Sequence, residues 1–247
     1  MICILFFLIK FRFINFHLKI IKREIMKLLE KFNISPNDSF LYEMAFTHSS
    51  YSAKFELDYD YERLEFLGDS VLNMLTSEFL QNMHPDYSEG KLTKLRANYV
   101  CQTALINYSH EFGLDECIKL NLEDNALSDN EVISITADVF ESFLGAIYLD
   151  QGIEKAKEFL TVTVFPYIES KTVFFFDYKS KIKEYGDAEN IEVSYELIEE
   201  HGAPHDKTFV MKILIDGKDY GHGVGKSKKE AEQVAACKAI ETLHLDE

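Results

Sequence analysis

Apolar residues recur at helical spacing through most of the first two thirds of the chain. Residues 26–170 follow the 3.6-residue period of amphipathic helices almost throughout. The helices that this pattern predicts begin after an N-cap at Asp38 or Ser39, run from near Asp60 to Pro85, and cover 89–110, 130–149 and 153–170. This part of the chain is therefore expected to be an all-α domain.

The pattern changes after the apolar cluster "VFFF" at 173–176. The segments "IEVSYELIEE" and "KTFVMKILIDG" alternate as strands do, "GKDYGHGVG" supplies turn glycines and a short third strand, and "SKKEAEQVAACKAIETL" returns to the helical period. With the helical "DYKSKIKEYG" in front, the order is α-β-β-β-α. We therefore expect an all-α domain at 26–170, a linker at 171–176 and a small α+β domain at 177–247.

Residues 1–25 are strongly apolar, but Lys10, Arg12 and Lys19 interrupt them before they reach the roughly 18 to 20 uncharged residues of a membrane span. Three interpretations remain open: a basic amphipathic membrane anchor, a helix docked on the rest of the chain, or an upstream stretch translated because the start was assigned early. The last is favoured, because ordinary amphipathic patterning begins at Met26. No stable membrane association is expected.

The chain is acidic, with 42 Asp and Glu against 26 Lys and Arg and a formal charge of -16. This charge argues against binding of polyanions through bulk attraction, so a nucleic-acid contact would need a local basic patch or metal ions. The four cysteines are scattered, which indicates neither a disulfide framework nor a zinc site. A reducing, cytoplasmic setting is expected.

The stretch "YERLEFLGDS" at 61–70 puts three carboxylates on one helix face. Glu65 and Asp69 fall within about 60° of Glu62 on the helix circumference. The opposite face is predicted to be a buried stripe made of Leu64, Leu67, Val71, Met74 and Leu75. Like charges three and four residues apart repel, so a divalent cation is the simplest compensation.

A second acidic pair, Asp138 and Glu141, lies one turn apart in the otherwise apolar "TADVFESFLGAIYLD". Gly145 follows one turn later and keeps that side open to another group. A salt bridge could satisfy these carboxylates, but Arg63, the basic residue near the motifs, turns away from the acidic face. Two acidic pairs on apolar helices instead predict a Mg²⁺ or Mn²⁺ site, which suits phosphoryl chemistry.

These residues carry a family resemblance. "YERLEFLGDSVLN" resembles the signature of ribonuclease III, which usually has Asn or His where this chain has Tyr61, and "ADVFESFLGAIYLDQG" resembles that family's second acidic motif. "AFTHSSY" and "YSEGKLTKLRANYV" match further blocks in the right order. The resemblance runs from about residue 26 to the end. It implies a homodimeric, divalent-metal-dependent endoribonuclease that cleaves double-stranded RNA, leaving 5′-phosphate and 3′-hydroxyl ends with short 3′ overhangs.

The resemblance also assigns site residues. The family's metal-binding and catalytic positions fall on Glu65, Asp69, Asp138 and Glu141, with Asp69 and Glu141 the strongest catalytic candidates. Its accessory acidic positions and its interface aromatic fall on Glu62, Glu89 and Phe66. Taken alone, the two accessory residues are equally well exposed helix charges, and a core position is the default for the phenylalanine. Mg²⁺ is the expected cofactor, with Mn²⁺ a possible substitute.

Two features depart from the family pattern. The segment "LNLEDNALSDNEVIS" lacks the expected glycine and basic residues, and Thr136 replaces a usual apolar residue. Both put loop shape and RNA fit in doubt. Lys94 and Arg96 could reach backbone phosphates, but are equally well ordinary solvated charges.

A lysine cluster opens the last predicted helix, where the helix dipole disfavours positive charge. Lys226, Lys228 and Lys229 would form a phosphate cradle with the exposed N–H groups there. The α-β-β-β-α segment as a whole resembles the double-stranded-RNA-binding domain. The contacts that this resemblance implies are Ser180, Lys183 and Glu184 at one minor groove, His205 in "GAPH" at the next, and the lysines on the phosphates between.

The sequence thus predicts a ribonuclease III acting in rRNA or mRNA processing. The rival interpretation is a structural protein that binds double-stranded RNA on the same fold without cleaving it. Loss of an acidic residue would mark that case, and none is lost here.

Overall fold

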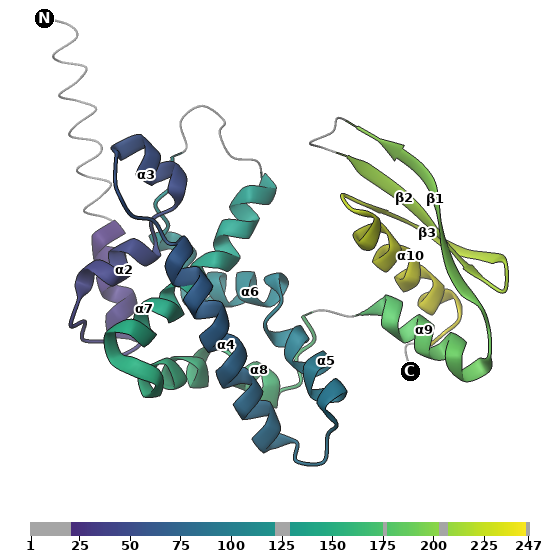
Figure 1. Cartoon of the computed structure of the whole chain (residues 1–247), viewed down its shortest axis with the longest axis horizontal. Coiled ribbons are helices and arrows are strands. Elements are labelled where there is room, and N and C mark those ends of the chain that lie inside the picture. Colours follow the sequence, from purple (N-terminus) through teal and green to yellow (C-terminus); the bar gives the residue numbers. More distant parts are fainter. Residues whose placement is uncertain (1–20, 122–128, 175–176, 203–206, 246–247) are drawn as a thin grey trace, which may run out of the picture. The chain divides into compact units, whose positions relative to one another are not determined.

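The computed structural model describes residues 21–121, 129–174, 177–202 and 207–245. The chain forms two compact units, Met1–Phe175 and Phe176–Glu247, and each has a hydrophobic core of its own (Figure 1). The division falls inside the predicted linker.

The regular elements in the described residues of the first unit are helices, as the sequence predicted, and an isolated β-bridge joins Thr47 to Lys119. Its helical segments are 21–31, α2 (Ser39–Ala45), α3 (Ser49–Phe55), α4 (Glu62–Met83), α5 (Glu89–Tyr99), α6 (Gln102–Phe112), the 3-10 turn η1 (Asp115–Cys117), α7 (Asp129–Thr163) and α8 (Phe165–Glu169). The Asp38 carboxylate caps α2 by accepting from the Phe40 N–H at 2.9 Å, which confirms the predicted N-cap.

Helix boundaries differ from the predicted ones in three places, one of which is Val164, where the helix expected over 153–170 divides into the end of α7 and α8. The single helix expected over 89–110 is wrong, because Cys101 takes an extended conformation (ψ 158°) and separates α5 from α6. The helices expected on either side of residue 152 are nearly continuous as α7, with a kink where Gly152 has φ 83°. A positive φ of this kind favours glycine, so the kink is encoded at that residue.

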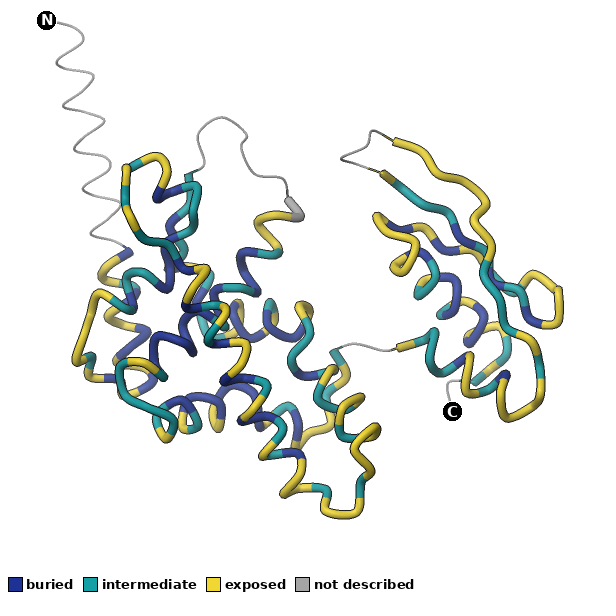
Figure 2. Tube along the Cα trace, viewed as in Figure 1, coloured by how far each residue is buried: buried dark blue, intermediate teal, exposed yellow. Residues whose placement is uncertain are grey.

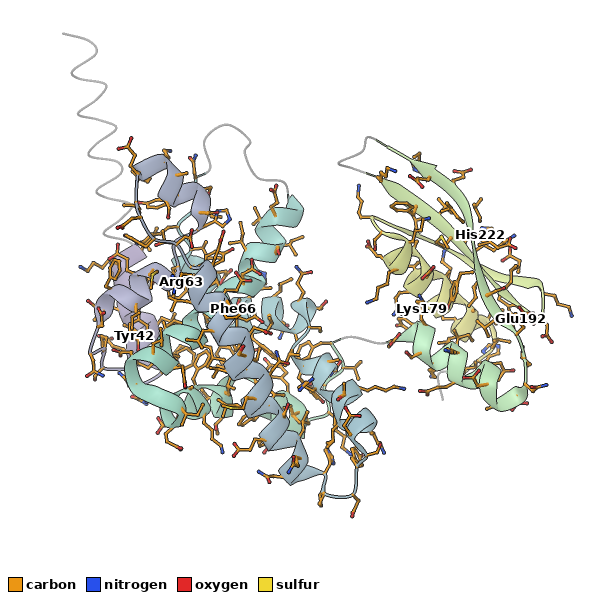
Figure 3. The ribbon with its side chains drawn as sticks, in the orientation of Figure 1. Tyr42, Arg63, Phe66, Lys179, Glu192 and His222 are labelled. Carbon is orange, nitrogen blue, oxygen red and sulfur yellow. The ribbon has the colours of Figure 1, made fainter. Side chains whose placement is uncertain are left out.

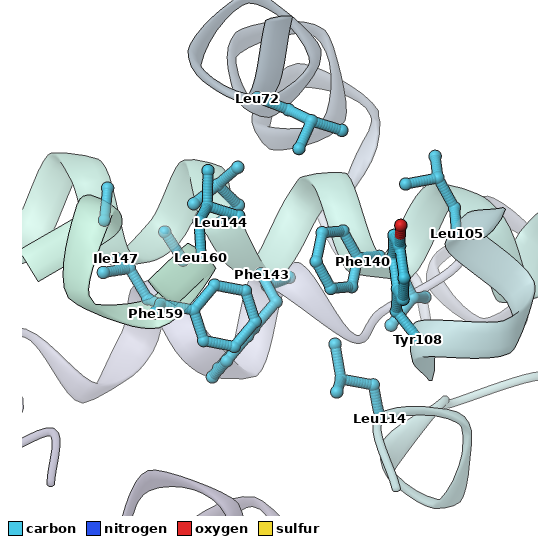
Figure 4. Packing of buried hydrophobic residues seen from close by; sticks show 14 of the residues in the cluster. Leu72, Leu105, Tyr108, Leu114, Phe140, Phe143, Leu144, Ile147, Phe159 and Leu160 are labelled. Carbon is cyan, nitrogen blue, oxygen red and sulfur yellow. The ribbon is translucent and has the colours of Figure 1, made fainter. Parts of the chain in front are cut away.

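The core of this unit is built around α7, which packs most extensively against α4. Phe140, Phe143, Leu144 and Ile147 of α7 are fully buried, and Figure 4 shows them among the neighbouring side chains. Met74 of α4 was expected in the buried stripe but is 53% exposed. Three residues beyond the buried Val71, it is turned about 60° from that residue, toward the side of α4 that carries the exposed Phe66.

Among the described residues, one helix (Glu131–Thr163) is long and apolar enough to cross a membrane by length and composition. Most of its apolar stretch, 61%, is buried inside the protein. Figure 2 shows the buried course of this helix through the unit. Its apolar character is therefore explained by its central place in the core.

The core begins earlier in the chain than predicted. Ile21 and Ile25 are 3% and 6% exposed and pack in the same cluster as Leu28 and Leu29. Their spacing places all four on one helix face. The core thus includes residues that the predicted boundary at Met26 assigned to an extension, while residues 1–20 lie outside the described part of the chain.

The second unit has the predicted order α-β-β-β-α. Its elements are α9 (Tyr178–Glu189), β1 (Val193–His201), β2 (Thr208–Ile215), β3 (Lys218–Gly225) and α10 (Lys228–Thr242). The strands form one antiparallel sheet in the order β1-β2-β3, and α10 packs on β2, β3 and α9. The core contains Ile182, Ile213, Ile215, Ala235, Ala236, Ala239 and Ile240.

The glycines near β3 do not all serve as turn residues. Gly217 makes the turn into the strand with φ 72°, but Gly221 and Gly223 lie within the strand, against α10. A Cβ atom on Gly223 would lie 1.9 Å from the Ala231 carbonyl oxygen. Gly221 and Gly223 therefore let α10 approach the sheet closely, while the predicted turn and third strand are confirmed at Gly217 and β3.

Candidate active site

The backbones of α4 and α7 touch where the two acidic motifs meet. A Cβ atom built on Gly68 would lie 1.8 Å from the Glu141 carbonyl oxygen, and one built on Gly145 would lie 2.3 Å from the Leu64 carbonyl oxygen. Neither contact leaves room for any side chain. The two glycines therefore let the helices approach closely enough to bring Asp69, beside Gly68, next to Glu141.

The four predicted carboxylates lie close enough for their charges to affect the pKa values of Glu65 and Glu141. Burial, followed by the charges of Asp69, Glu65 and Asp138, raises the pKa of Glu141 to about 8. Burial, followed by the charges of Asp138, Glu62 and Asp69, raises the pKa of Glu65 to about 7. We call Glu65, Asp69, Asp138 and Glu141 the acidic cluster. Both helices contribute carboxylates to it, Glu65 and Asp69 from α4 and Asp138 and Glu141 from α7.

The acidic cluster suits a hard divalent cation by its chemistry. Its donors are carboxylate oxygens, which Mg²⁺ and Mn²⁺ prefer, and a cation would offset the repulsion and burial that raise the pKa values of Glu65 and Glu141. In this conformation, however, no group of three or more His, Cys, Asp or Glu side chains in the described residues has the geometry to hold an ion. The metal site therefore remains a prediction.

Tyr61, the N-cap residue of α4, connects the two acidic motifs. Its hydroxyl donates to Asp138 Oδ2 at 3.0 Å, and its ring lies 5.7 Å from the His48 ring. Burial raises the pKa of Asp138, while the hydrogen bond from Tyr61 and the charge of His48 lower it. Burial and the Asp138 charge raise the pKa of Tyr61, so its phenol stays protonated as a donor.

The place of Tyr61 in the acidic motif is a sequence signal for this hydrogen bond. Tyr61 stands where the resembling signature usually has Asn or His, both polar residues able to donate a hydrogen bond. His48 lies in the matching "AFTHSSY" block, and its Nδ1 accepts from the Ser50 N–H at 3.2 Å. Burial is the main cause that lowers the pKa of His48.

Comparison with known proteins decides the family. A model described as Ribonuclease-III-like matches residues 38–168, and one described as a double-stranded RNA binding motif matches residues 178–243. The Ribonuclease 3 of Geobacillus kaustophilus is 40% identical over 226 residues, covering 90% of this chain and 92% of that protein. The chain belongs to the ribonuclease III family. It is accordingly an endoribonuclease of that family, with a double-stranded-RNA-binding domain.

Two further relatives support the assignment to the ribonuclease III family. The Ribonuclease 3 of Anoxybacillus flavithermus is 43% identical over 203 residues, covering 81% of this chain and 85% of that protein. The solved nuclease domain of the Campylobacter jejuni ribonuclease III is 32% identical, with a TM-score of 0.52, and the match covers 60% of this chain and 98% of that domain. The helical unit thus has the ribonuclease III nuclease fold.

The two accessory residues occupy different surroundings. Glu62 is exposed in the first turn of α4, and its charge helps raise the pKa of Glu65, so it lies near the acidic cluster. Glu89 is exposed at the start of α5, where it accepts from the Thr93 hydroxyl at 3.0 Å. It lines a separate pocket with His84. Within this chain the structure groups Glu62, but not Glu89, with the cluster.

Phe66 is 79% exposed on α4, which excludes a core position (Figure 3). Met74, two turns along the same helix, is 53% exposed. Contiguous exposed apolar patches mark protein interfaces, whereas single exposed apolar residues are ordinary on protein surfaces. The interface role of Phe66 remains a prediction.

The other two candidate cations lie on α5. Arg96 donates to the Ser77 hydroxyl at 2.9 Å, which ties its guanidinium to α4. Lys94 lines a pocket with Lys91 and Lys171. Their contact with phosphates also remains a prediction.

The lysine cluster lies at the start of α10. Lys226, Lys228 and Lys229 are all exposed. The helix start is capped much as in a capping box, because the Ser227 hydroxyl accepts from the Glu230 N–H at 3.2 Å and the Glu230 carboxylate accepts from the Lys226 N–H, one residue before the N-cap, at 2.7 Å. These bonds fix the backbone that carries the three lysines.

The predicted contacts on α9 lie beside this cluster. The Ser180 hydroxyl donates to Asp177 at 2.6 Å, and the positive charge of Lys229 helps lower the pKa of Asp177. Lys183 and Glu184 are exposed on the same helix. The structure thus brings the start of α9 near the start of α10, whereas His205 lies outside the described residues.

Proposed function

We propose that this protein is a metal-dependent endoribonuclease that hydrolyses double-stranded RNA to 5′-phosphate and 3′-hydroxyl ends during rRNA and mRNA processing in the cytoplasm. The observation that supports it best is the contact between α4 and α7 at Gly68 and Glu141, where the charges of Asp69, Glu65 and Asp138 help raise the pKa of Glu141.

Mg²⁺ is the proposed physiological ion, with Mn²⁺ as a substitute, since carboxylate donors suit both. When bound, such an ion supplies Lewis-acid stabilisation of charge at the phosphodiester and favours ionisation of the attacking water. Glu65 and Asp138 would complete the ligand set. Asp69 and Glu141 lie at the contact between the helices and would contribute most to catalysis.

Glu141 has a further property that the reaction can use. Its pKa of about 8 means that it tends to hold a proton near neutral pH when no cation is bound. A cation that displaces this proton would convert Glu141 into a charged ligand, which couples metal binding to proton release.

Recognition of RNA is assigned to the second unit. Lys226, Lys228 and Lys229 would contact phosphates, while Ser180, Lys183, Glu184 and His205 would face the minor grooves. The net charge of -16 leaves the lysine cluster as a local attractive patch on an acidic protein. Such a patch favours binding by A-form shape over general attraction to polyanions.

A homodimer is proposed through the α4 surface around Phe66. The exposed Phe66 and Met74 supply apolar area suited to an interface between two copies. Two-fold symmetry would place one acidic cluster against each strand of a duplex. A solved relative, the Campylobacter jejuni nuclease domain, is described as having a region involved in dimer formation.

The decisive test is Glu141→Gln, assayed on a long RNA duplex with Mg²⁺. We expect cleavage to fall at least about 100-fold, because a ligand is lost, while duplex binding in a gel-shift assay stays unchanged. Glu158→Gln is the matched control, because Glu158 lies on the same helix but is exposed and pairs with Lys155. Undiminished cleavage by the Glu141 variant would refute the proposed site. A chelator should abolish cleavage by the unsubstituted protein.

A further inference from the structure

We infer that Tyr61 is a positioning residue whose hydroxyl orients Asp138 for cation binding, so that loss of the hydroxyl weakens the protein's affinity for a divalent ion. This inference depends on the proposed metal site. It assigns a role to a residue outside the acidic cluster.

The backbone of Tyr61 is fixed on both sides. Its N–H donates to the Thr47 carbonyl at 2.9 Å, and its carbonyl accepts from the N–H groups of Leu64 and Glu65, each at 2.9 Å. Glu65 belongs to the acidic cluster, and its N–H forms its helical hydrogen bond to the Tyr61 carbonyl. The position of Tyr61 is therefore tied directly to the helix turn that carries Glu65.

The side chain of Tyr61 has little freedom. The residue is 3% exposed, and its ring packs beside His48. Its hydroxyl reaches from the start of α4 to α7 and donates to Asp138 Oδ2 at 3.0 Å. This hydrogen bond favours one orientation of the Asp138 carboxylate. Rotation of that carboxylate would break the bond and leave the buried Tyr61 hydroxyl without this partner.

This hydrogen bond determines how Asp138 can meet a cation. With Oδ2 engaged by the hydroxyl, the carboxylate would present Oδ1 to an ion, which favours binding through a single oxygen. Residues that hydrogen-bond to a metal ligand support metal binding in this way. Their loss typically lowers metal affinity by about 10-fold to 100-fold.

The same unit contains a second tyrosine–aspartate pair that serves as a control. The Tyr42 hydroxyl donates to Asp150 Oδ2 at 2.9 Å, and Tyr42 is fully buried. Asp150 lies on α7, twelve residues beyond Asp138 and nine beyond Glu141, so the pair is about 14 to 18 Å along the helix from the acidic residues of α7. Tyr42→Phe removes the same chemical group from a site without a proposed ligand.

The experiment compares Tyr61→Phe, Tyr42→Phe and the unsubstituted full chain. Mn²⁺ affinity is measured without RNA by electron paramagnetic resonance of the free ion, and folding is followed by thermal melting. We expect Tyr61→Phe to raise the Kd for Mn²⁺ about 10-fold. We expect Tyr42→Phe to lower the melting temperature but to leave that Kd unchanged. In cleavage assays, saturating Mn²⁺ should restore most of the activity of Tyr61→Phe.

Each result discriminates. Equal Kd values for the unsubstituted protein and Tyr61→Phe overturn the positioning role and leave the proposed function standing. Equal weakening by the two variants also overturns it, because the effect is then a general loss of packing. If the unsubstituted protein binds no Mn²⁺, the proposed metal site fails together with this inference.

Discussion

The contact between α4 and α7 gives a sharp prediction for Gly68→Ala. The added methyl group would lie 1.8 Å from the Glu141 carbonyl oxygen and 2.5 Å from its carbonyl carbon. The obstacle is backbone, so no side chain can rotate away to accept it. The substitution must therefore separate the two helices where the acidic cluster is assembled.

The size of the effect follows from the distances. Moving the methyl group from 1.8 Å to at least 3.0 Å from that oxygen displaces one helix by about 1.2 Å. Overpacking of this kind costs up to about 3 kcal/mol, and the gain in helix propensity from Gly to Ala returns about 1 kcal/mol. We expect a net loss of about 2 kcal/mol in stability. A misplacement of 1 Å at a catalytic centre lowers the rate by about 100-fold.

The assay measures kcat on a duplex substrate and thermal melting for three variants. Gly145→Ala should have a smaller effect than Gly68→Ala, because its methyl group would lie 2.3 Å from the Leu64 carbonyl oxygen. Gly90→Ala is the control, since a Cβ atom there meets nothing within 4 Å. It should keep full activity with unchanged or slightly higher stability.

The graded order of the three variants is the critical result. If Gly68→Ala retains the melting temperature and kcat of the unsubstituted protein, the helices are not in contact as described. If it melts at a lower temperature but keeps its kcat, the contact is real but does not position the acidic cluster.

Three further predictions concern other parts of the molecule. Combined Lys228→Ala and Lys229→Ala should weaken duplex binding and reduce the slope of log K against log salt by about 1 per lysine, and an unchanged slope in a titration from 50 to 200 mM salt would contradict the phosphate contacts. A chain begun at Met26 should lose about 3 kcal/mol in denaturant unfolding, because Ile21 and Ile25 leave the core, and equal stability would place them outside it. In chelator, the melting temperature should fall by roughly 5 °C from pH 5 to pH 8.5. The two glutamates of the acidic cluster have folded-state pKa values raised to about 7 and about 8, so the stability they give at low pH is lost as the pH rises through those values. A flat profile in chelator, or one that Mg²⁺ does not flatten, would argue against a cation-binding cluster.

The helix content and the change to an α-β-β-β-α unit could be read from the sequence, because hydrophobic period is a local property. The break between α5 and α6 could not. It depends on an extended backbone at Cys101, a residue that has no strong conformational preference of its own. The contact between Gly223 and α10 also could not be predicted from the sequence. A glycine that makes room for a packed helix has the same sequence signature as a turn glycine.

At the acidic cluster, sequence spacing predicted which carboxylates share a helix face, but not what holds them. The bond from Tyr61 to Asp138 joins residues 77 positions apart, and no periodicity can reveal such a partner. The exposure of Phe66 is a second property that residue spacing could not predict. Hydrophobicity alone assigned it to the core by default, whereas its 79% exposure follows from which side of α4 meets α7.

The acidic residues and the glycines of this site serve the same contact between α4 and α7. A glycine within a helix costs about 1 kcal/mol relative to alanine, and a buried carboxylate without a cation costs more. Gly68 and Gly145 lie at the contact between α4 and α7, and Glu141, whose pKa is raised mainly by burial, lies at the same contact, so both kinds of unfavourable residue occur there. Either alone could be an accident of packing. In combination they have one explanation: the glycines let the two backbones approach, and carboxylates from both helices then lie close enough for their charges to interact. Conflicts between local preference and global fold are expected to occur at functional sites.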